Sequence, residues 1–215
     1  MARVRAAPLS VRLVLASASP GRLSVLRAAG VEPEVVVSGV DESDVAGTPA
    51  EIAAELARRK AAAVAELPVA RGALVLGCDS VLELDGLAHG KPADAADAVR
   101  RWRLMRGRQG VLMTGHCLVD RRTDAFATAE AVARTGVSFA DLSDAEIEAY
   151  VGTGEPMRVA GAFTVDGLGG WFVAGVDGAP SNVVGLSLPL LRDLLAEVGV
   201  GVADLWPGRP AFANR

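Results

Sequence analysis

The chain contains very little lysine. Lys60 and Lys91 are the two lysines among the 22 basic residues of a 215-residue sequence, and the other 20 are arginines. Arginine can replace lysine wherever a generic positive charge is enough, but not where a compact, rotatable ammonium group is needed. Both lysines are therefore candidate functional residues.

Cysteine and histidine are also scarce. Cys78 and Cys117 are too few and too far apart in the sequence for a zinc knuckle or a disulfide framework. His89 and His116 add too little for a metal site of the histidine and cysteine type. The sequence instead predicts reduced, buried thiols in a cytoplasmic protein.

Long apolar runs and an excess of positive charge are absent as well. No stretch of about 18 apolar residues occurs, so no membrane span is expected. Arg3 and Arg5 precede an apolar stretch like that of a signal peptide, but Arg12 interrupts it and leaves too short an uncharged run. The net charge of −4 argues against a protein that binds the backbone of nucleic acids. We expect a cytoplasmic protein with neither a membrane nor a nucleic-acid partner.

One basic cluster stands out in this mildly acidic chain. Five arginines lie close together on a predicted helix and just beyond its end: Arg100, Arg101, Arg103, Arg106 and Arg108. A charge run of this kind is typical of the solvated face of a helix, and we interpret it in that way.

Apolar runs, helix caps and turn residues alternate along the chain. Strands are expected at 11–16, 34–38, 73–79, 111–120, 125–139, 163–165 and 171–176, with a hairpin turn at Asp85-Gly86. Helices are expected at 19–30, 48–68, 93–105, 143–150 and 188–198, and those starting near Thr48 and Ser143 have capping boxes. This order predicts a single α/β domain over residues 1–215, with a mixed twisted β-sheet flanked by helices and flexible ends at 1–10 and 207–215.

Two serines and an arginine follow the first predicted strand. Ser17, Ser19 and Arg22 belong to a turn that opens a helix, where backbone N–H groups and a guanidinium can hold an anion. The spacing matches neither a Walker loop nor a dinucleotide-binding fingerprint. Ser19 before Pro20 also suits a simple helix cap, so an anion site and a cap both remain open.

Three carboxylates crowd the loop after the second predicted strand, in Asp41-Glu42-Ser43-Asp44. Hard oxygen ligands of this kind suit Mg²⁺ or Mn²⁺, which commonly link one or two carboxylates to substrate phosphates. An acidic, solvated loop is the alternative interpretation.

The two lysines lie in different settings. Lys60 ends a charged run on a helix of small apolar residues, where a solvated helix end is the alternative to a functional role. Lys91 lies between Gly90 and Pro92, which restrict the backbone and so aim the ammonium group. Asp79 closes an apolar strand, and a buried carboxylate is costly unless it is paired or bound to metal. A structural acid that caps a loop is the alternative for Asp79.

These candidates indicate one type of chemistry. Ligands of α/β folds bind beyond the carboxyl ends of strands, where Ser17, Ser19 and Asp79 are expected. The candidates include acids, two lysines, an arginine and two serines, but no nucleophilic cysteine and no Ser–His pair. This set fits metal-assisted phosphoryl chemistry better than acyl transfer or redox chemistry. Thr114-Gly115, after another strand, is expected to shape the backbone.

In their joint order, these segments resemble the Maf family of nucleoside triphosphate pyrophosphatases. The similarity runs from about residue 11 to 195 and is carried by segments 15–20, 41–42, 57–61, 77–81, 90–92, 114–115, 160–163 and 181–186. No single segment is specific, but their order is.

The resemblance implies hydrolysis of a nucleoside triphosphate to the monophosphate and pyrophosphate, with a divalent cation such as Mg²⁺ or Mn²⁺. It implies a fold similar to that of inosine triphosphate pyrophosphatases, removal of non-standard or surplus nucleotides, a link to cell-division arrest and a possible homodimer. At the matching positions Asp79 is the expected general base and, with Glu42, a metal ligand. The residues expected to bind the triphosphate are Ser17, Ser19, Arg22, Lys60 and Lys91, and the two lysines are also expected to assist catalysis.

Charge considerations add an expectation about Asp79. A carboxylate beside two lysines and a metal ion should have a low pKa. Asp79 would then orient water through a metal-bound hydroxide rather than act as a strong base.

The chain departs from the family pattern at three places. Gly21-Arg22 replaces a pair of arginines, and Arg158-Val159 replaces Asp-Lys. Asp166 stands where pyrimidine-preferring members carry glutamine, and members resembling the 7-methylguanosine-triphosphate type carry a carboxylate there. A carboxylate accepts two hydrogen bonds and suits the donor edge of guanine, whereas an amide suits the mixed edge of uracil or thymine. We expect a purine-lactam or methylated-guanine preference over dTTP and UTP.

Two other functions remain possible from the sequence. A sugar nucleotidyltransferase also opens with a strand, a loop of small residues and an arginine, although its loop is usually glycine-rich. A non-catalytic nucleotide-binding regulator of cell division would fit the loss of polar groups at two of the departures. Product formation with and without a sugar phosphate separates these alternatives from a pyrophosphatase.

Overall fold

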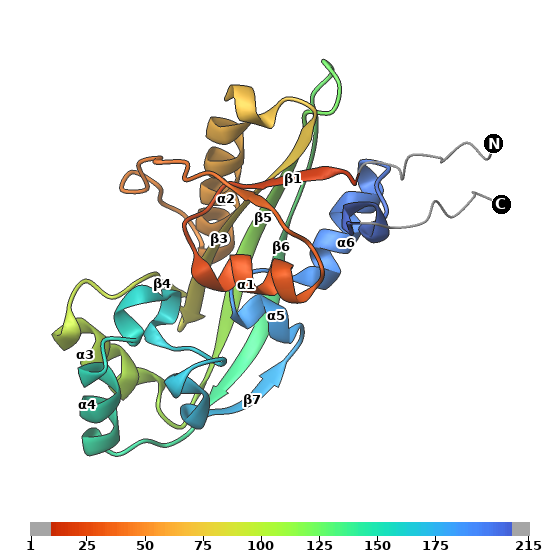
Figure 1. The fold of residues 1–215 in the computed structure, drawn as a ribbon. Coiled ribbons are helices and arrows are strands. Elements are labelled where there is room, and N and C mark those ends of the chain that lie inside the picture. Colours follow the sequence, from red (N-terminus) through yellow and green to blue (C-terminus); the bar gives the residue numbers. More distant parts are fainter. Residues whose placement is uncertain (1–9, 208–215) are drawn as a thin grey trace, which may run out of the picture.

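The computed structural model describes residues 10–207, in which a mixed β-sheet carries helices on both faces (Figure 1). The α/β class with a mixed sheet flanked by helices is thereby confirmed. The ends expected to be flexible, 1–10 and 207–215, lie outside the described residues apart from positions 10 and 207.

The described elements follow the predicted order closely. The strands are β1 Arg12–Leu15, β2 Glu34–Val35, β3 Ala73–Leu84, β4 Leu87–His89, β5 Gln109–Asp120, β6 Ala127–Phe139 and β7 Val173–Asp177. The α-helices are α1 Pro20–Ala28, α2 Pro49–Ala65, α3 Ala95–Met105, α4 Asp144–Gly152, α5 Pro180–Val183 and α6 Leu188–Glu197. Short 3₁₀ turns are η1 Pro68–Ala70, η2 Pro156–Arg158, η3 Ala160–Ala162, η4 Leu168–Phe172 and η5 Val202–Leu205. The capping boxes at Thr48 and Ser143 are both formed.

The sheet changes from parallel to antiparallel pairing at β3. Its order is β2-β1-β3-β5-β6-β7, with β4 paired to the far end of β3. Strand β1 runs parallel to β2 and β3, whereas β3, β5, β6 and β7 pair antiparallel. Leu15, the last residue of β1, pairs with Leu76, and β3 continues to Leu84 without β1 beside it. The loop that follows β1 therefore lies beside the second half of β3.

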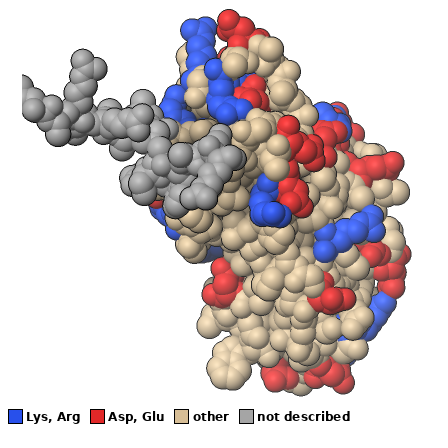
Figure 2. Space-filling view, turned by 90° about the vertical axis from the view of Figure 1, so that its right-hand side faces the viewer, with Lys and Arg blue, Asp and Glu red and all other residues tan. Residues whose placement is uncertain are grey.

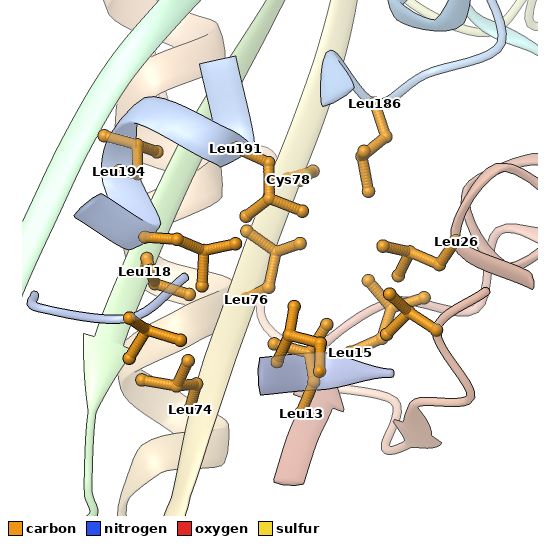
Figure 3. Packing of buried hydrophobic residues seen from close by; sticks show 14 of the residues in the cluster. Leu13, Leu15, Leu26, Leu74, Leu76, Cys78, Leu118, Leu186, Leu191 and Leu194 are labelled. Carbon is orange, nitrogen blue, oxygen red and sulfur yellow. The ribbon is translucent and has the colours of Figure 1, made fainter. Parts of the chain in front are cut away.

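Alternate residues of the central strands face opposite helices. On one face, α1 and α6 pack over a leucine-rich core (Figure 3). The strand residues of that core are Leu13, Leu15, Leu74, Leu76, Cys78, Leu118 and Ala129. On the other face, α2 packs on Val14, Val75 and Cys117. Because side chains alternate along a strand, Asp79 faces α2 and Ser80 faces α1.

Two glycines allow α2 to lie directly on the sheet. A Cβ atom added at Gly115 of β5 would lie 2.1 Å from the carbonyl oxygen of Ala53, and one at Gly77 of β3 would lie 2.3 Å from that of Ala57. Real side chains never approach a backbone so closely, so glycine is required at both positions. Gly115 thus shapes the backbone, as expected. Gly77 allows α2 to lie close to β3 in the part of the helix that carries Lys60.

A second core lies at the end of the long strands where α3 and α4 gather (Figure 1). Trp102 of α3 is its centre, with ring centroids 5.6 Å from Phe139, 5.5 Å from Tyr150 and 6.0 Å from Phe172. The Trp102 indole N–H donates to the carbonyl of Ala162 at 2.8 Å. This core anchors the chain from η2 to η4, which borders the functional site.

Three predicted strands differ from the structure. The strand predicted to end at Asp79 continues to Leu84, because Asp79 is paired inside the fold and does not mark an exit to solvent. The strand predicted at 34–38 is only two residues long. The strand predicted at 163–165 is wrong: the segment follows a tight turn with positive φ at Gly161 and Ala162 and forms no ladder.

Both thiols lie in the interior of the fold. Cys78 and Cys117 are buried and unpaired, and burial raises their pKa values to about 12 and about 11, so neither is a reactive thiolate. Acidic and basic side chains are interspersed on the face shown in Figure 2. Between residues 10 and 207, no helix is long and apolar enough to cross a bilayer.

We predict that Gly77→Ala lowers the free energy of unfolding by about 2 kcal/mol or more, because the backbone of α2 must move away from β3. Gly152 is the matched control, since a Cβ atom there meets nothing within 4 Å. Urea denaturation should show Gly152→Ala unchanged or slightly more stable. A similar loss in both variants would show that α2 does not depend on this close approach.

Candidate functional site

One large cavity brings the residues of the sequence analysis together. It has a volume of about 1080 Å³ and lies between the β1–α1 turn, α2, β3 and the segment from Thr153 to Leu168. The residues predicted for the site all line this cavity: Ser17, Ser19, Arg22, Glu42, Lys60, Asp79, Lys91 and Asp166. They come from segments distant in sequence, which the sheet aligns at the end of β1.

Arg22 is the buried cation of the β1–α1 turn. Its guanidinium donates to Ser17 Oγ at 2.9 Å, to Ser80 Oγ at 3.2 Å and to the carbonyl of Gly185 at 2.9 Å. Arg22 is only 8% exposed and has no carboxylate partner among the described residues. A buried guanidinium without a counter-ion attracts an anion.

The serines of this turn support both interpretations made from the sequence. Ser19 caps α1, since its Oγ accepts from the N–H of Arg22. Ser17 Oγ accepts from the N–H of Ser19 at 3.2 Å as well as from Arg22. The turn is thus a helix cap whose hydroxyls also line the cavity.

The segment 181–186 holds Arg22 from the opposite side. Gly185, at φ +115°, turns its carbonyl to the guanidinium, and a Cβ there would lie 3.4 Å from the Arg22 side chain. Asn182 anchors the segment by donating to the carbonyl of Leu112 at 3.2 Å and to Thr135 Oγ1 at 3.1 Å. This role of the segment was not predicted from the sequence.

Lys60 is the centre of the acidic part of the cavity. Its Nζ lies 2.5 Å from Asp79 Oδ1 and 2.7 Å from Glu42 Oε1. The side chains of Lys60 and Asp79 are only 11% and 12% exposed, whereas Glu42 is 51% exposed. Lys60 is therefore not a solvated helix end, and Asp79 is not an acid that caps a loop.

Burial raises the pKa of Asp79, and the charges of Lys60 and Arg22 lower it to a smaller extent. Among the described residues Lys60 is the lysine that contacts the carboxylate, and burial outweighs that contact, so the pKa of Asp79 is raised without a metal ion and the low pKa expected beside one stays a prediction. Lys60 bonds Oδ1, and no described residue donates a hydrogen bond to Oδ2. A carboxylate with a raised pKa and a free oxygen is suited to accept a proton.

Only one carboxylate of the acidic loop turns into the cavity. Asp41 accepts from the N–H of Ser43 at 2.9 Å, and Asp44 pairs with Arg59 at 2.6 Å. Glu42 alone reaches Lys60. Within the described part of the chain no group of three or more potential metal ligands converges. Two carboxylates do fit Mg²⁺, which usually takes one or two of them and completes its shell with water and phosphate.

Lys91 lines the cavity from the opposite side. Its side chain is exposed and forms no ion pair with the described residues. The carbonyl of Gly90, before it, accepts from Arg101 Nη1 at 2.7 Å and from the N–H of Gly161 at 3.1 Å. Arg101 is only 16% exposed, so the solvated helix face expected for the arginine cluster is wrong for this member.

Asp166 is exposed at the mouth of the cavity, on a loop held by Glu155. The Glu155 carboxylate accepts from Tyr150 Oη at 2.9 Å, from Thr164 Oγ1 at 2.5 Å and from the N–H groups of Leu168 and Gly169 at 3.0 and 2.9 Å. Glu155 was not predicted from the sequence, because nothing in Gly154-Glu155-Pro156 distinguishes it from an ordinary turn.

His116 lies near the site but has a structural role. Its Nδ1 lies 3.0 Å from the carbonyl of Thr114, and its Nε2 accepts from the N–H of Ser187 at 2.9 Å. Burial lowers the pKa of His116 to about 4, so the ring is neutral at pH 7. Both ring nitrogens are engaged, and His116 joins β5 to the start of α6.

Comparisons with known proteins place the chain among relatives. The family model described as "Maf-like protein" matches residues 12–198. A protein of Salinispora tropica named nucleoside triphosphate pyrophosphatase is 61% identical over 202 residues, which cover 92% of this chain and 88% of that protein. Proteins of the same name from Streptomyces coelicolor and Streptomyces avermitilis are 59% and 56% identical, over 91% and 92% of this chain and 94% and 96% of their own lengths.

A solved structure is similar at a lower level. The crystal structure of a nucleoside-triphosphatase / dITP/XTP pyrophosphatase from Mycobacterium abscessus gives a TM-score of 0.41 at 16% identity, covering 87% of this chain and 94% of that one. This similarity is too low to bear on fold or function.

We predict that Lys60→Met lowers the free energy of unfolding by about 3 kcal/mol at pH 8, because it leaves Asp79 buried without its cation. The pKa of Asp79 then rises further, so the folded protein keeps a proton that the unfolded chain releases above about pH 4. The loss should therefore be smaller at pH 5 than at pH 8. Urea denaturation of Lys60→Met and the unmodified protein at pH 5 and pH 8 measures this loss in the free energy of unfolding.

Lys91→Met is the matched control, because this lysine lines the same cavity and forms no ion pair within residues 10–207. It should change stability by less than about 0.5 kcal/mol. Adding Asp79→Asn to Lys60→Met should recover part of the loss at pH 8. An equal loss for Lys60→Met at both pH values would contradict the pairing of charges described above.

Proposed function

This chain belongs to the family of Maf-like proteins, and from this premise we propose that it hydrolyses nucleoside triphosphates to the monophosphate and pyrophosphate. The observation that carries the proposal is one cavity lined both by Lys60, which holds two carboxylates, and by the buried Arg22, which has no counter-ion among the described residues. The names of the relatives support the same activity. We also propose that the protein acts in the cytoplasm and clears non-standard nucleotides.

The cations of the cavity would bind the triphosphate. Arg22 is held by Ser17, Ser80 and Gly185, so its guanidinium needs no reorganisation when an anion arrives. Ser17 and Ser19 would add hydroxyl donors at the start of α1, and Lys91 would approach from the opposite side. Fixed cations stabilise the charge that grows on the leaving pyrophosphate.

Asp79 would act as the general base. Its Oδ2 would accept a proton from a water molecule as the water oxygen bonds to the α-phosphorus. The bond between the α-phosphorus and the bridging oxygen breaks, and pyrophosphate leaves with the electron pair. Lys60 fixes the carboxylate through Oδ1 and keeps Oδ2 turned to the water. Without a metal ion, burial raises the pKa of Asp79, which supports its role as a proton acceptor.

Glu42 and Asp79 would hold the divalent cation. Lys60 contacts one oxygen of Glu42, which leaves the second oxygen for the metal, and Asp79 would add its negative charge beside the metal while Oδ2 stays free for the water. A bound Mg²⁺ or Mn²⁺ would supply positive charge to the phosphate oxygens. The choice between Mg²⁺ and Mn²⁺ stays a prediction. A homodimer and a link to cell-division arrest also stay predictions.

Asp166 would select the base. It lies on the loop that Glu155 fixes at the mouth of the cavity, where a nucleobase can reach it. Its carboxylate would accept from the N–H groups of a guanine edge. A purine-lactam or methylated guanine is therefore the proposed base.

A turnover panel tests the proposed function. With Mg²⁺, the protein should release pyrophosphate and monophosphate from nucleoside triphosphates, with kcat/KM for GTP or 7-methyl-GTP at least about 10-fold above that for UTP and dTTP. Asp166→Gln should narrow this ratio, because an amide suits the edge of uracil and thymine. Asp193→Asn, an exposed acid away from the cavity, is the control.

Other outcomes identify the alternatives. Pyrophosphate release only in the presence of a sugar phosphate would favour a sugar nucleotidyltransferase. Tight nucleotide binding without product in Mg²⁺ or Mn²⁺ would favour a non-catalytic regulator. Equal kcat/KM for UTP and the guanine nucleotides would remove the role given to Asp166.

A further inference from the structure

We propose that Arg101 is a positioning residue that holds the backbone on both sides of Lys91 and so aims its ammonium group at the bound phosphates. The proposal rests on the proposed function, because it takes Lys91 to be a phosphate-binding group. Arg101 lies on α3, outside the cavity lining, and would act only through Lys91.

The contacts of the guanidinium carry the proposal. Nη1 donates to the carbonyl of Gly90 at 2.7 Å, and Nη2 lies 3.5 Å from the carbonyl of Lys91. These two carbonyls lie on either side of the Lys91 Cα, so a single planar group holds the residue at two points. The rigid fork of an arginine suits such two-point contact, and a lysine ammonium does not.

Arg101 is itself held in place. Nη2 pairs with Asp97 Oδ2 at 2.7 Å, and both side chains are only 16% exposed. Asp97 also accepts from the N–H of Ala93 at 3.0 Å, just after Gly90-Lys91-Pro92. The loop and the start of α3 therefore form one hydrogen-bonded unit.

Pro92 is buried, but side-chain packing does not hold Gly90 and Lys91 before it. A Cβ atom placed at Gly90 would meet nothing within 4 Å, so space is open there. The Lys91 side chain is exposed and has no ion pair among the described residues. The direction of its long, flexible side chain thus depends on its backbone, which Arg101 and the N–H of Gly161 hold by hydrogen bonds.

The neighbouring Arg100 provides a matched control. It pairs with the same Asp97, through Oδ1 at 3.1 Å, but it is 64% exposed and contacts neither carbonyl of the loop. Arg100 and Arg101 share a helix, a charge and a partner, and differ in the loop contacts. A general effect of removing positive charge from α3 would appear in both.

A double-mutant cycle tests the proposal. Arg101→Met, Arg100→Met, Lys91→Met and Arg101→Met/Lys91→Met are compared by kcat/KM for GTP and by the Kd for inorganic pyrophosphate with Mg²⁺, from calorimetry. Arg101→Met should lower kcat/KM by about 10-fold or more and raise the Kd for pyrophosphate by a similar factor. Arg100→Met should change each quantity by less than about 2-fold. In the Lys91→Met background, Arg101→Met should cost less than a further 2-fold or so, because its effect passes through Lys91.

Arg101→Lys tests whether a loss of activity in Arg101→Met comes from misfolding. It keeps the charge beside Asp97 but cannot span both carbonyls, so it should unfold at the wild-type midpoint and still lose kcat/KM. The proposal would be overturned if the loss of kcat/KM in Arg101→Met/Lys91→Met equalled the product of the losses in the two single variants. A wild-type Kd for pyrophosphate in Arg101→Met would overturn it as well. Wild-type kcat/KM for Lys91→Met would overturn it too, while pyrophosphate release by the unmodified protein would leave the proposed function standing.

Discussion

The buried ion pair between Lys60 and Asp79 is the interaction on which the rest of the site depends. Two charges removed from water are tolerated only when each compensates the other at close range. That range requires α2 to lie directly on β3 and β5, which Gly77 and Gly115 permit. The pair in turn fixes one oxygen of Asp79, leaves the other free and draws Glu42 in from its loop.

The end of β1 determines which groups meet around this pair. Because β3 continues where β1 stops, alternate residues of β3 face two different helices beyond that point. Asp79 meets Lys60 on the α2 side, and Ser80 meets Arg22 on the α1 side. The groups proposed for acid–base chemistry and for anion binding thus lie on opposite faces of one strand, and the crevice at the carboxyl ends of the parallel strands joins them.

Residue type, order and the family resemblance were sufficient to predict residues that the structure brings to one cavity, and their roles stay predictions. The two lysines in an arginine-rich chain, the capped helices and Gly90-Lys91-Pro92 carry signals that are local in sequence. The burial of one arginine in a cluster is not local: Arg101 is far less exposed than Arg100 and reaches the carbonyls of Gly90 and Lys91, which Arg100 does not contact. The raised pKa of Asp79 and the role of Glu155 likewise depend on distant segments that close over them.

The central claim is that Asp79 takes a proton from the attacking water. The most direct measurement is the kcat of Asp79→Asn for GTP with saturating Mg²⁺, alongside the Kd for pyrophosphate. An amide of the same size cannot accept that proton, so kcat should fall by about 100-fold or more while pyrophosphate still binds. Turnover close to that of the wild type would contradict the account.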